Sequence, residues 1–407
     1  MATRVEELEL PSTRDLGPNP RREEFIDEAR RLRAQNWLIR SEYGFHVVSY
    51  EDTVDLLRDR NLHQASQLVS RMIAGTGTAL DQLEENNGIL SAEGEDHTRL
   101  RRLVSQSFSP KSADSLRPFM RAYVDNVVSN LNYVDDECIF EFQAAFREFP
   151  IAVICELIGV AHEDWDLFSH WAELLFIRWS PLIIGREQEY VDGMGEFRTY
   201  CENLINERRA NLGTDLVSTL ITVEEEGDRL STDELISLVQ GMIAAGTDTT
   251  RNQLGNLIAL LAQRPQEWAQ LRSDPTLIPT AVEESLRFLN PIGTVIRQVA
   301  QPFTHKGVTF SPGQLISFSL SSANRDEERF DEPDLFSLAR TEARNHLTFS
   351  SGIHHCLGAA LARAELQEAL SSLVSAWSTL EMNDEPEWKH GRLAIWGPQA
   401  LHVRVSR

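Results

Sequence analysis

Residues 232–263 constrain the fold of this chain more than any other stretch, and they have the pattern of a single long helix. Residues 231–234 read Ser-Thr-Asp-Glu, which is typical of a capping box, where a serine and a glutamate satisfy free backbone N–H groups at a helix start. At 1.5 Å per residue this helix would span about 45–50 Å, enough to cross a whole domain. The rest of the chain must therefore pack around it.

Helical periodicity also dominates the remaining sequence. We expect a helix starting at Pro265 and others over residues 22–34, 49–58, 96–107, 112–131, 140–158, 164–176, 187–211, 279–289 and 357–377. Short strands are expected over residues 37–40, 45–48, 294–299, 303–304, 308–309 and 315–320, with a hairpin over residues 393–405. The predicted fold class is mainly α with a small β region. We expect an N-terminal arm (residues 1–19) and one domain (residues 20–407), with β parts near residues 36–49, 294–320 and 393–405.

Composition excludes several classes of protein. The formal net charge is −23 and the pI about 4.9, which disfavours nucleic-acid binding because phosphate contacts need clustered Lys and Arg. Four cysteines in 407 residues do not make a disulfide framework. The first residues lack the apolar core of a signal peptide, and no apolar run is long enough to span a membrane. We therefore expect a cytoplasmic protein.

The strongest local signal is the string Phe-Ser-Ser-Gly-Ile-His-His-Cys-Leu-Gly-Ala-Ala-Leu-Ala-Arg at residues 349–363. Cys356 lies at the start of an Ala/Leu-rich helix, where free N–H groups and the helix dipole favour a thiolate. A single cysteine in this position can also be a small buried apolar residue. A zinc site is a further alternative, but His354, His355 and one cysteine match no common zinc spacing.

The whole string resembles the haem-binding loop of the cytochrome P450 family, Phe-x-x-Gly-x-His-x-Cys-x-Gly. The positions of this pattern are filled by Phe349, Gly352, His354, Cys356 and Gly358. The resemblance implies that Cys356 is the axial thiolate ligand of the iron of haem b. Position 350, often glycine in the family, is serine in this chain.

A second signal is the polar segment Ala-Ala-Gly-Thr-Asp-Thr-Thr at residues 244–250, inside the long apolar helix. Hydroxyls that bond back to helix carbonyls bend a helix, and a glycine weakens it, so a packing kink is one interpretation. The segment also resembles the family's oxygen-binding groove, Ala-Gly-x-Asp/Glu-Thr. This implies that Ala245 and Gly246 lie beside the haem, Gly246 making room for dioxygen. It also implies that Thr249 hydrogen-bonds to the bound oxygen and that Asp248 relays protons from solvent.

A third signal, Glu284-Ser-Leu-Arg287, is on its own an ordinary surface ion pair. In this order it resembles the family's Glu-x-x-Arg brace behind the cysteine loop. The family's third partner is an arginine in a Pro-x-Arg-Phe segment, but here Leu335 occupies that position. We therefore assign the third role to Arg340.

The propionates of a haem are two carboxylates that would be costly to bury without partners. His97 and Arg101 resemble the family's His-x-x-x-Arg pair and, four residues apart, share one helix face. Arg297 and His354 match the other two propionate-binding positions.

The resemblance implies a triangular, helix-rich prism with the haem between the long central helix and the helix after the cysteine loop. It implies a monooxygenase that inserts one atom of O2 into a lipophilic small molecule, by hydroxylation or epoxidation, while the other atom leaves as water. No dinucleotide fingerprint or flavin domain is present in this sequence, so electrons should come from a ferredoxin and its reductase. Arg102, Lys111 and Arg363 are candidate ferredoxin contacts.

Two alternatives remain at this point. One is a peroxide-driven or non-oxygenating haem-thiolate enzyme, and the other is a haem-binding sensor without turnover. The Asp248–Thr249 pair weighs against the first, because an enzyme that does not activate dioxygen has less need of a proton relay.

The residues expected above the haem are apolar and partly small, which favours a medium or large lipophilic substrate. They are Ala244, Ala245, Gly293, Val295, Ile395 and Trp396. Residues 83–90 and 177–184 are expected to form a mobile roof.

Overall fold

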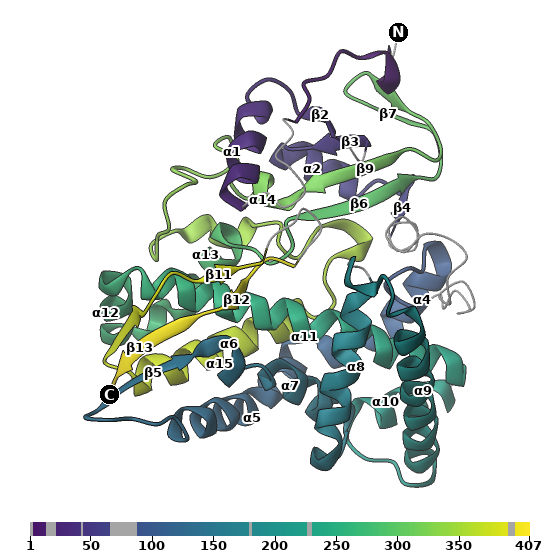
Figure 1. Ribbon diagram of the computed structural model, residues 1–407. Helices are drawn as coiled ribbons and strands as arrows, with labels where there is room; N and C mark the ends of the chain where they lie inside the picture. Colours follow the sequence, from purple (N-terminus) through teal and green to yellow (C-terminus); the bar gives the residue numbers. More distant parts are fainter. Residues whose placement is uncertain are drawn as a thin grey trace.

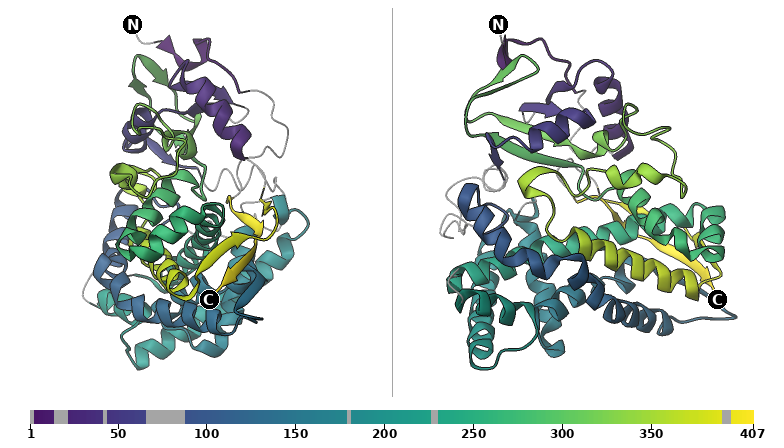
Figure 2. Two further views of the ribbon diagram at one scale, coloured as in Figure 1. Left: turned by 90° about the vertical axis from the view of Figure 1, so that its left-hand side faces the viewer. Right: turned by 180° about the vertical axis from the view of Figure 1, so that it is seen from behind.

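A β-rich part carrying the N-terminus lies above a larger helical part, as the views in Figure 1 and Figure 2 show. The computed structural model describes residues 3–13, 22–41, 44–65, 88–178, 181–225, 230–389 and 395–407. Buried apolar side chains form one large cluster in the helical part and a second cluster in the β-rich part. No helix of the described segments combines the length and the apolar composition that crossing a membrane requires.

The long helix predicted from the sequence is α11 (Thr232–Ala262), which runs through the middle of the helical part (Figure 1). Its capping box is formed, since the Ser231 hydroxyl accepts from the Glu234 N–H (3.1 Å) and the Glu234 carboxylate accepts from the Ser231 N–H (2.8 Å). Most of its second half is buried against its neighbours α7, α8, α13 and α15.

The other helices follow the apolar periodicity closely. They are α1 (Arg22–Arg33), α2 (Tyr50–Leu57), α4 (Gly94–Ser105), α5 (Pro110–Ser129), α6 (Phe142–Ala145), α7 (Phe149–Ile158), α8 (Trp165–Ile177), α9 (Glu187–Ala210), α10 (Leu216–Glu225), α12 (Pro265–Ser273), α13 (Ile278–Phe288), α14 (Leu320–Ala323) and α15 (Ala359–Ala376). The helix α10 has no counterpart in the sequence-based prediction.

Four small sheets complete the described fold. The largest has the order β2 (Leu38–Ser41), β3 (Gly44–Val47), β9 (Leu315–Ser319), β6 (Thr294–Val299) and β4 (Leu62–Gln64). A second joins β1 (Thr3–Arg4), β8 (Val308–Phe310) and β7 (Phe303–His305), and a third joins β10 (Thr379–Met382), β13 (His402–Ser406) and β5 (Glu137–Glu141). The fourth pairs β11 (Glu387–Trp388) with β12 (Pro398–Ala400).

The single helix predicted over residues 140–158 is wrong. Residues 137–141 are the strand β5, because their backbone pairs with β13 from the far end of the chain. The Glu141 carboxylate then caps α6 by accepting from the Gln143 N–H (2.9 Å). Pro150 lies in the first turn of α7, where its missing N–H costs nothing, so a new helix starts there.

Both ends of the chain join sheets with partners that are distant in sequence. The predicted hairpin over residues 393–405 is wrong: β12 pairs with β11, and β13 lies between β10 and β5. Residues 393–394 of that prediction lie outside the described residues. Near the N-terminus, β1 runs parallel to β8, Val5 is fully buried, and Ser12 bridges to Arg40.

Candidate active site

A cavity of about 310 Å³ lies between α11 and the start of α15. Its wall is mostly apolar and includes Ile89, Leu90, Phe108, Ile154, Met242, Ile292, Val295, Leu320, Phe349, Leu357 and Leu361. Cys356 lines it from the loop before α15, and Ala245, Gly246 and Thr249 line it from α11. The two strongest sequence signals therefore meet in one space.

The loop before α15 is built to present Cys356. The Cys356 N–H donates to the Phe349 carbonyl (2.9 Å), which closes the loop on itself. Gly352 has a φ of +76°, and a Cβ there would lie 2.1 Å from the carbonyl oxygen of Leu57 at the end of α2. Only glycine fits at this position. Ser350 has a φ of +61°, which explains physically why glycine suits position 350.

The Cys356 side chain is exposed to the cavity. Desolvation raises the pKa of its thiol, while the Gly358 N–H and the charges of Arg101 and Arg363 lower it less strongly. The protein by itself therefore favours the thiol over the thiolate. A metal cation at the sulfur would supply the missing positive charge, so the site fits a haem iron. The zinc alternative gains no support, since the described residues hold no cluster of three metal-ligating side chains.

The four expected propionate-binding residues lie near one another. The His97 and His354 rings are 4.4 Å apart, and Arg101 Nη2 donates to the His355 carbonyl (2.5 Å). Arg297, on β6, is 4% exposed and donates to Gln64 Oε1 (2.8 Å). His97, Arg101, His354 and Gln64 all line the cavity.

The charge of this group fits two added carboxylates. Burial lowers the pKa of Arg297 to about 10. Burial, followed by the charges of His354 and Arg101, lowers the pKa of His97 to about 4. Glu93, whose Oε1 is 3.1 Å from His354 Nε2, is the carboxylate that acts against both shifts. An anionic ligand beside these buried groups would remove the penalty of burying positive charge.

In the polar segment of α11, side chains bond back to the helix. Thr249 Oγ1 donates to the Ala245 carbonyl (2.6 Å), and Thr247 Oγ1 donates to the Ile243 carbonyl (2.9 Å). Gly246 packs against α7, since a Cβ at this residue would lie 2.8 Å from Ile154 Cδ1. The glycine therefore also permits close helix packing.

Asp248 lies on the other side of α11 from the cavity. It lines a separate hollow of about 200 Å³ together with Arg147, Arg186 and Arg251, and its carboxylate is ion-paired with Arg251. Asp248 Oδ2 is buried and has no hydrogen-bond partner among the described residues. The neighbouring residues Asp248 and Thr249 thus face two different spaces, one toward the outside and one toward Cys356.

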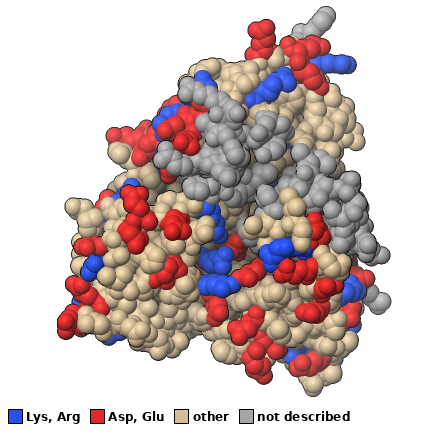
Figure 3. Space-filling model, in the orientation of Figure 1, with Lys and Arg blue, Asp and Glu red and all other residues tan. Residues whose placement is uncertain are grey.

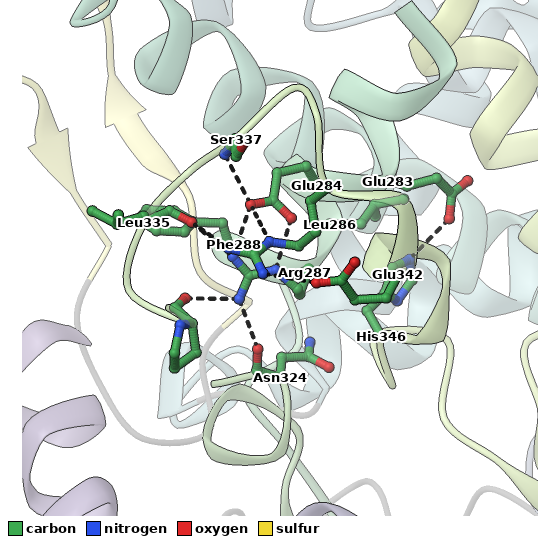
Figure 4. A network of polar contacts seen from close by, with 12 residues as sticks. Glu283, Glu284, Leu286, Arg287, Phe288, Asn324, Leu335, Ser337, Glu342 and His346 are labelled. Atoms are coloured by element: carbon green, nitrogen blue, oxygen red, sulfur yellow. Dashed lines mark hydrogen bonds and ion pairs between the residues drawn. The ribbon is translucent and has the colours of Figure 1, made fainter. Parts of the chain in front are cut away.

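The structure brings together the three residues of the expected brace, as Figure 4 shows for Glu284 and Arg287. The fully buried Arg287 donates from Nε (2.7 Å) and Nη2 (2.8 Å) to the Glu284 carboxylate, and Arg340 Nε donates to Glu284 Oε1 (3.1 Å). Arg287 Nη1 also donates to the carbonyls of Asn324 (3.0 Å) and Pro333 (2.8 Å). The brace therefore ties α13 to the loop that precedes the cysteine segment.

A second polar network beside the brace was missed by the sequence analysis. Glu283 Oε2 lies 3.3 Å from His346 Nε2, and Arg363 donates to both carboxylate oxygens of Glu283 (2.6 and 3.0 Å). The guanidinium of Arg363 also stacks over the Phe349 ring at 4.5 Å. Arg363 is therefore held by Glu283 and Phe349 while its side chain stays 28% exposed, and its role as a ferredoxin contact stays a prediction. The adjacent residues Glu283 and Glu284 could have indicated this network in the sequence, because two neighbouring carboxylates on one helix need two sets of partners.

Several expected pocket residues lie elsewhere. Ala245 and Val295 line the cavity, but Ala244 lines the hollow beside Asp248. Gly293 packs against the Trp396 ring, because a Cβ at this residue would lie 2.9 Å from the ring. Trp396 is itself buried against Phe25. Ile395 bridges to the backbone of Ile292. Position in sequence thus did not predict which of these side chains reach the cavity.

The expected roof lies only partly within the described residues. Residues 83–87 and 179–180 fall outside them, while Ile89 and Leu90 line the cavity. Leu182 and Ile184 are exposed, whereas Ile177 lines the hollow beside Asp248.

Comparisons with known proteins agree with this geometry. Residues 46–399 match the family model named Cytochrome P450. Mycinamicin IV hydroxylase/epoxidase of Micromonospora griseorubida is 34% identical over 379 residues, which cover 90% of this chain and 91% of that protein. Vitamin D(3) 25-hydroxylase of Pseudonocardia autotrophica is 38% identical over 280 residues, covering 68% of this chain and 67% of that protein.

Solved structures give the same result. The cytochrome P450 PksS of the bacillaene polyketide synthase of Bacillus subtilis 168 superimposes with a TM-score of 0.82 at 28% identity, covering 94% of this chain and 97% of that chain. P450BioI, solved with a fatty-acyl-loaded acyl carrier protein, also gives a TM-score of 0.82 at 29% identity, covering 94% and 98%. With Cys356 and Thr249 facing one apolar cavity, these similarities show that the chain belongs to the cytochrome P450 family and is one of its monooxygenases.

Proposed function

We propose that this protein uses haem b, held by the Cys356 thiolate, to insert one oxygen atom of O2 into a lipophilic small molecule in the cytoplasm. The observation that carries the proposal is the shared cavity: Cys356 faces it from the loop before α15, Thr249 faces it from α11, and its wall is otherwise mostly apolar. The overall reaction balances as substrate, O2, two electrons and two protons giving hydroxylated or epoxidised product and one water. The haem supplies the oxygen chemistry when bound.

The residues that would hold the cofactor follow from the site. Cys356 would supply the sulfur ligand of the iron, and His97, Arg101, Arg297 and His354 would supply donors and positive charge for the propionates. Gly352 allows the cysteine loop to approach the end of α2, and the Glu284 brace ties α13 to the segment that precedes this loop.

The delivery of the two protons is assigned to Asp248 and Thr249. Asp248 faces the outer hollow, where it can exchange protons with solvent when its ion pair with Arg251 opens. Thr249 faces the cavity, where its hydroxyl can donate a hydrogen bond once it leaves the Ala245 carbonyl. A carboxyl and a hydroxyl on either side of α11 are suited to move protons inward one at a time.

The wall of the cavity supports a lipophilic substrate. Among the similar proteins, the names of two describe a mycinamicin hydroxylase/epoxidase and a vitamin D(3) hydroxylase. A bulky molecule with few charges is the substrate class we propose for this chain, since burying a charge against such a wall would be costly.

Electrons are proposed to come from a ferredoxin and its reductase. Figure 3 shows that acidic side chains predominate on the face it displays, in keeping with the net charge of −23. Basic residues near the cysteine side therefore matter for docking an acidic partner. Arg102 and Lys111 are exposed and remain candidates. Charge reversal at both residues should slow reduction by ferredoxin, most at low salt, and unchanged rates would contradict this docking site.

The first test is the carbon-monoxide difference spectrum of the reduced, purified protein. We expect a strongly red-shifted Soret band, which is the signature of a haem iron bound by a thiolate. The Cys356→His variant should lose it. An unshifted band in the wild-type protein would contradict the ligand assignment, and a preparation that binds no haem would overturn the proposal.

A second test separates a monooxygenase from a peroxide-driven enzyme. The Thr249→Ala variant should consume reducing equivalents without a matching amount of product, because the cavity loses its proton-donating hydroxyl. Equal coupling in wild type and variant would favour the peroxide-driven alternative. A protein that consumes no NADH with a surrogate ferredoxin and a panel of apolar compounds would favour a sensor without turnover.

A further inference from the structure

Two buried oxygen atoms on facing helices lack hydrogen-bond donors. Gln253 on α11 and Glu365 on α15 both line the cavity, and both are almost fully buried. Gln253 Oε1 and Glu365 Oε2 have no hydrogen-bond partner among the described residues. Such orphaned acceptors are rare in native proteins and call for an explanation.

The orientation of the Gln253 amide is fixed by Ser285 on α13. The Ser285 hydroxyl gives its one hydrogen to the Val282 carbonyl (2.8 Å), so it can only accept from Gln253. Gln253 Nε2 therefore donates to Ser285 Oγ (3.1 Å), and Oε1 must point elsewhere. What Gln253 Oε1 lacks is a donor.

Glu365 can be that donor only if its carboxyl group is protonated. Burial raises the pKa of Glu365 well above that of a free glutamate, and no neighbouring cation opposes the shift. Glu368, one turn later on the same helix, differs: it receives hydrogen bonds from Arg117 (3.0 Å) and Arg121 (2.9 Å). The two glutamates are thus buried in opposite electrostatic settings.

We propose that Glu365 is a neutral carboxylic acid whose O–H donates to Gln253 Oε1, and that this acid–amide pair joins α15 to α11 beside the haem cavity. The proton satisfies both orphaned oxygens, because it makes one of them the partner of the other. Through Ser285 the chain of bonds continues to α13, next to Glu284 of the brace.

The pair makes Glu365 a positioning residue. Gln253 lies four residues after Thr249, on the same face of α11, while α15 begins three residues after Cys356. Fixing Gln253 against α15 would therefore fix the distance between the Thr249 hydroxyl and the cysteine loop. This consequence for turnover rests on the proposed function, whereas the pair itself does not.

The test is the pH dependence of unfolding of the haem-loaded protein, comparing wild type with Glu365→Gln. The unfolded glutamate ionises near pH 4.3, whereas the folded one stays protonated. Stability from this group is therefore complete below pH 4.3 and declines as the pH rises. Above pH 4.3, for as long as the folded carboxyl keeps its proton, the ratio of the two unfolding constants should change tenfold per pH unit, which is one proton.

Other titratable groups near the pair are the same in both proteins and cancel in this ratio. They are His97, Arg101, His354, His355 and Cys356 in the cavity, Glu283, Glu284 and Arg287 on α13, and Arg117 and Arg121 on α5 facing Glu368. Glu368→Gln is the matched control: it should lower stability by breaking the contacts with Arg117 and Arg121, and it leaves Glu365 and its proton in place. Parallel curves for wild type and Glu365→Gln would overturn the proposal.

Two further measurements cover the remaining outcomes. The infrared band of a protonated carboxyl should persist in the wild-type protein at pH 8, shift in D2O and be absent from Glu365→Gln. If the wild-type protein lacks this band, the proposal is overturned even if the variant fails to fold. A cycle of Gln253→Leu, Glu365→Leu and the double variant should show coupling of about tenfold in the unfolding constant. Strict additivity would refute the bond to Gln253. None of these readouts depends on ferredoxin, substrate or turnover.

Discussion

Replacing Ser350 by glycine should stabilise this protein, although the position lies inside the cysteine loop. Ser350 has a φ of +61°, in the left-handed region that disfavours side chains with a Cβ. Its Oγ is buried and has no hydrogen-bond partner among the described residues, so the substitution breaks no bond that the structure contains. The Ser350 N–H donates to the Leu347 carbonyl (2.7 Å), and glycine would keep this backbone contact.

The magnitude follows from two opposing terms. A non-glycine residue in the left-handed region costs roughly 1–2 kcal/mol. Glycine loses more backbone freedom on folding, which costs roughly 0.5–1 kcal/mol. The balance is a gain of about 0.5–1 kcal/mol for Ser350→Gly.

The assay is equilibrium urea unfolding of the haem-loaded protein, followed by circular dichroism, with the carbon-monoxide spectrum recorded alongside. The unfolding midpoint should rise and the position of the red-shifted band should stay the same. Glu332→Gly is a matched control, because Glu332 is exposed and has a φ of +42°, so it should give a similar gain away from the cavity. Gly352→Ala should do the opposite and cost at least about 2 kcal/mol, since its Cβ would overlap the Leu57 carbonyl.

A fall in stability for Ser350→Gly, with the expected gain in Glu332→Gly, would refute this reasoning. It would mean that the hydroxyl makes a bond in the loaded protein that outweighs the backbone strain.

Three other predictions concern the polar networks and the packing of α11. Arg340→Met should destabilise the protein by about 2–4 kcal/mol, because Glu284 keeps Arg287 but loses its second buried cation. The double variant with Glu284→Gln should lose less stability than the sum of the two single variants. Full additivity in urea unfolding would contradict a shared brace. Burial raises the pKa of Glu283, but bonds from His346 and Arg363 outweigh it and lower the pKa to about 2. This carboxylate therefore stabilises the fold above the unfolded pKa of about 4.3, and its contribution of about 3 kcal/mol is lost as the pH falls from 4 to 2. Glu283→Gln should flatten the plot of unfolding free energy against pH in this window, and an unchanged acid slope would refute the assignment. Gly246→Ala should be compensated by Ile154→Val, which removes the Cδ1 atom 2.8 Å from the new Cβ, so the pair should be more stable than the sum of the single variants predicts in thermal unfolding.

Local sequence predicted much of the fold because most of its elements are stabilised by nearby residues. The α11 helix was predicted with its start at the capping box and its end one residue too far, since both the cap and the apolar pattern are local. The strands β6 and β9 were found because turn residues surround them. Residues 137–141 could not be found in this way: their apolar run suits a helix equally well, and only pairing with β13 makes them a strand.

The candidate site divides in the same manner. The cysteine loop and the Glu284–Arg287 pair were found because their residues lie close together in sequence, and Arg340 was assigned because Leu335 occupies the position of the family's arginine. Trp396 and Gly293 were misplaced, because whether a side chain near β6 enters the cavity or packs inward depends on α1, a distant element that supplies Phe25.

The sequence by itself determined the residues that carry the chemistry: a cysteine before a helix, a hydroxyl and a carboxylate inside a long helix, and arginines spaced for two carboxylates. Tertiary structure alone decided which spaces these residues face. Asp248 and Thr249 are neighbours, yet the 100° turn per residue of a helix points one outward and the other toward Cys356. Gln253 and Glu365, unremarked in the sequence, line the same cavity only because α11 and α15 pack together, and burial without a countercharge is what makes one of them an acid.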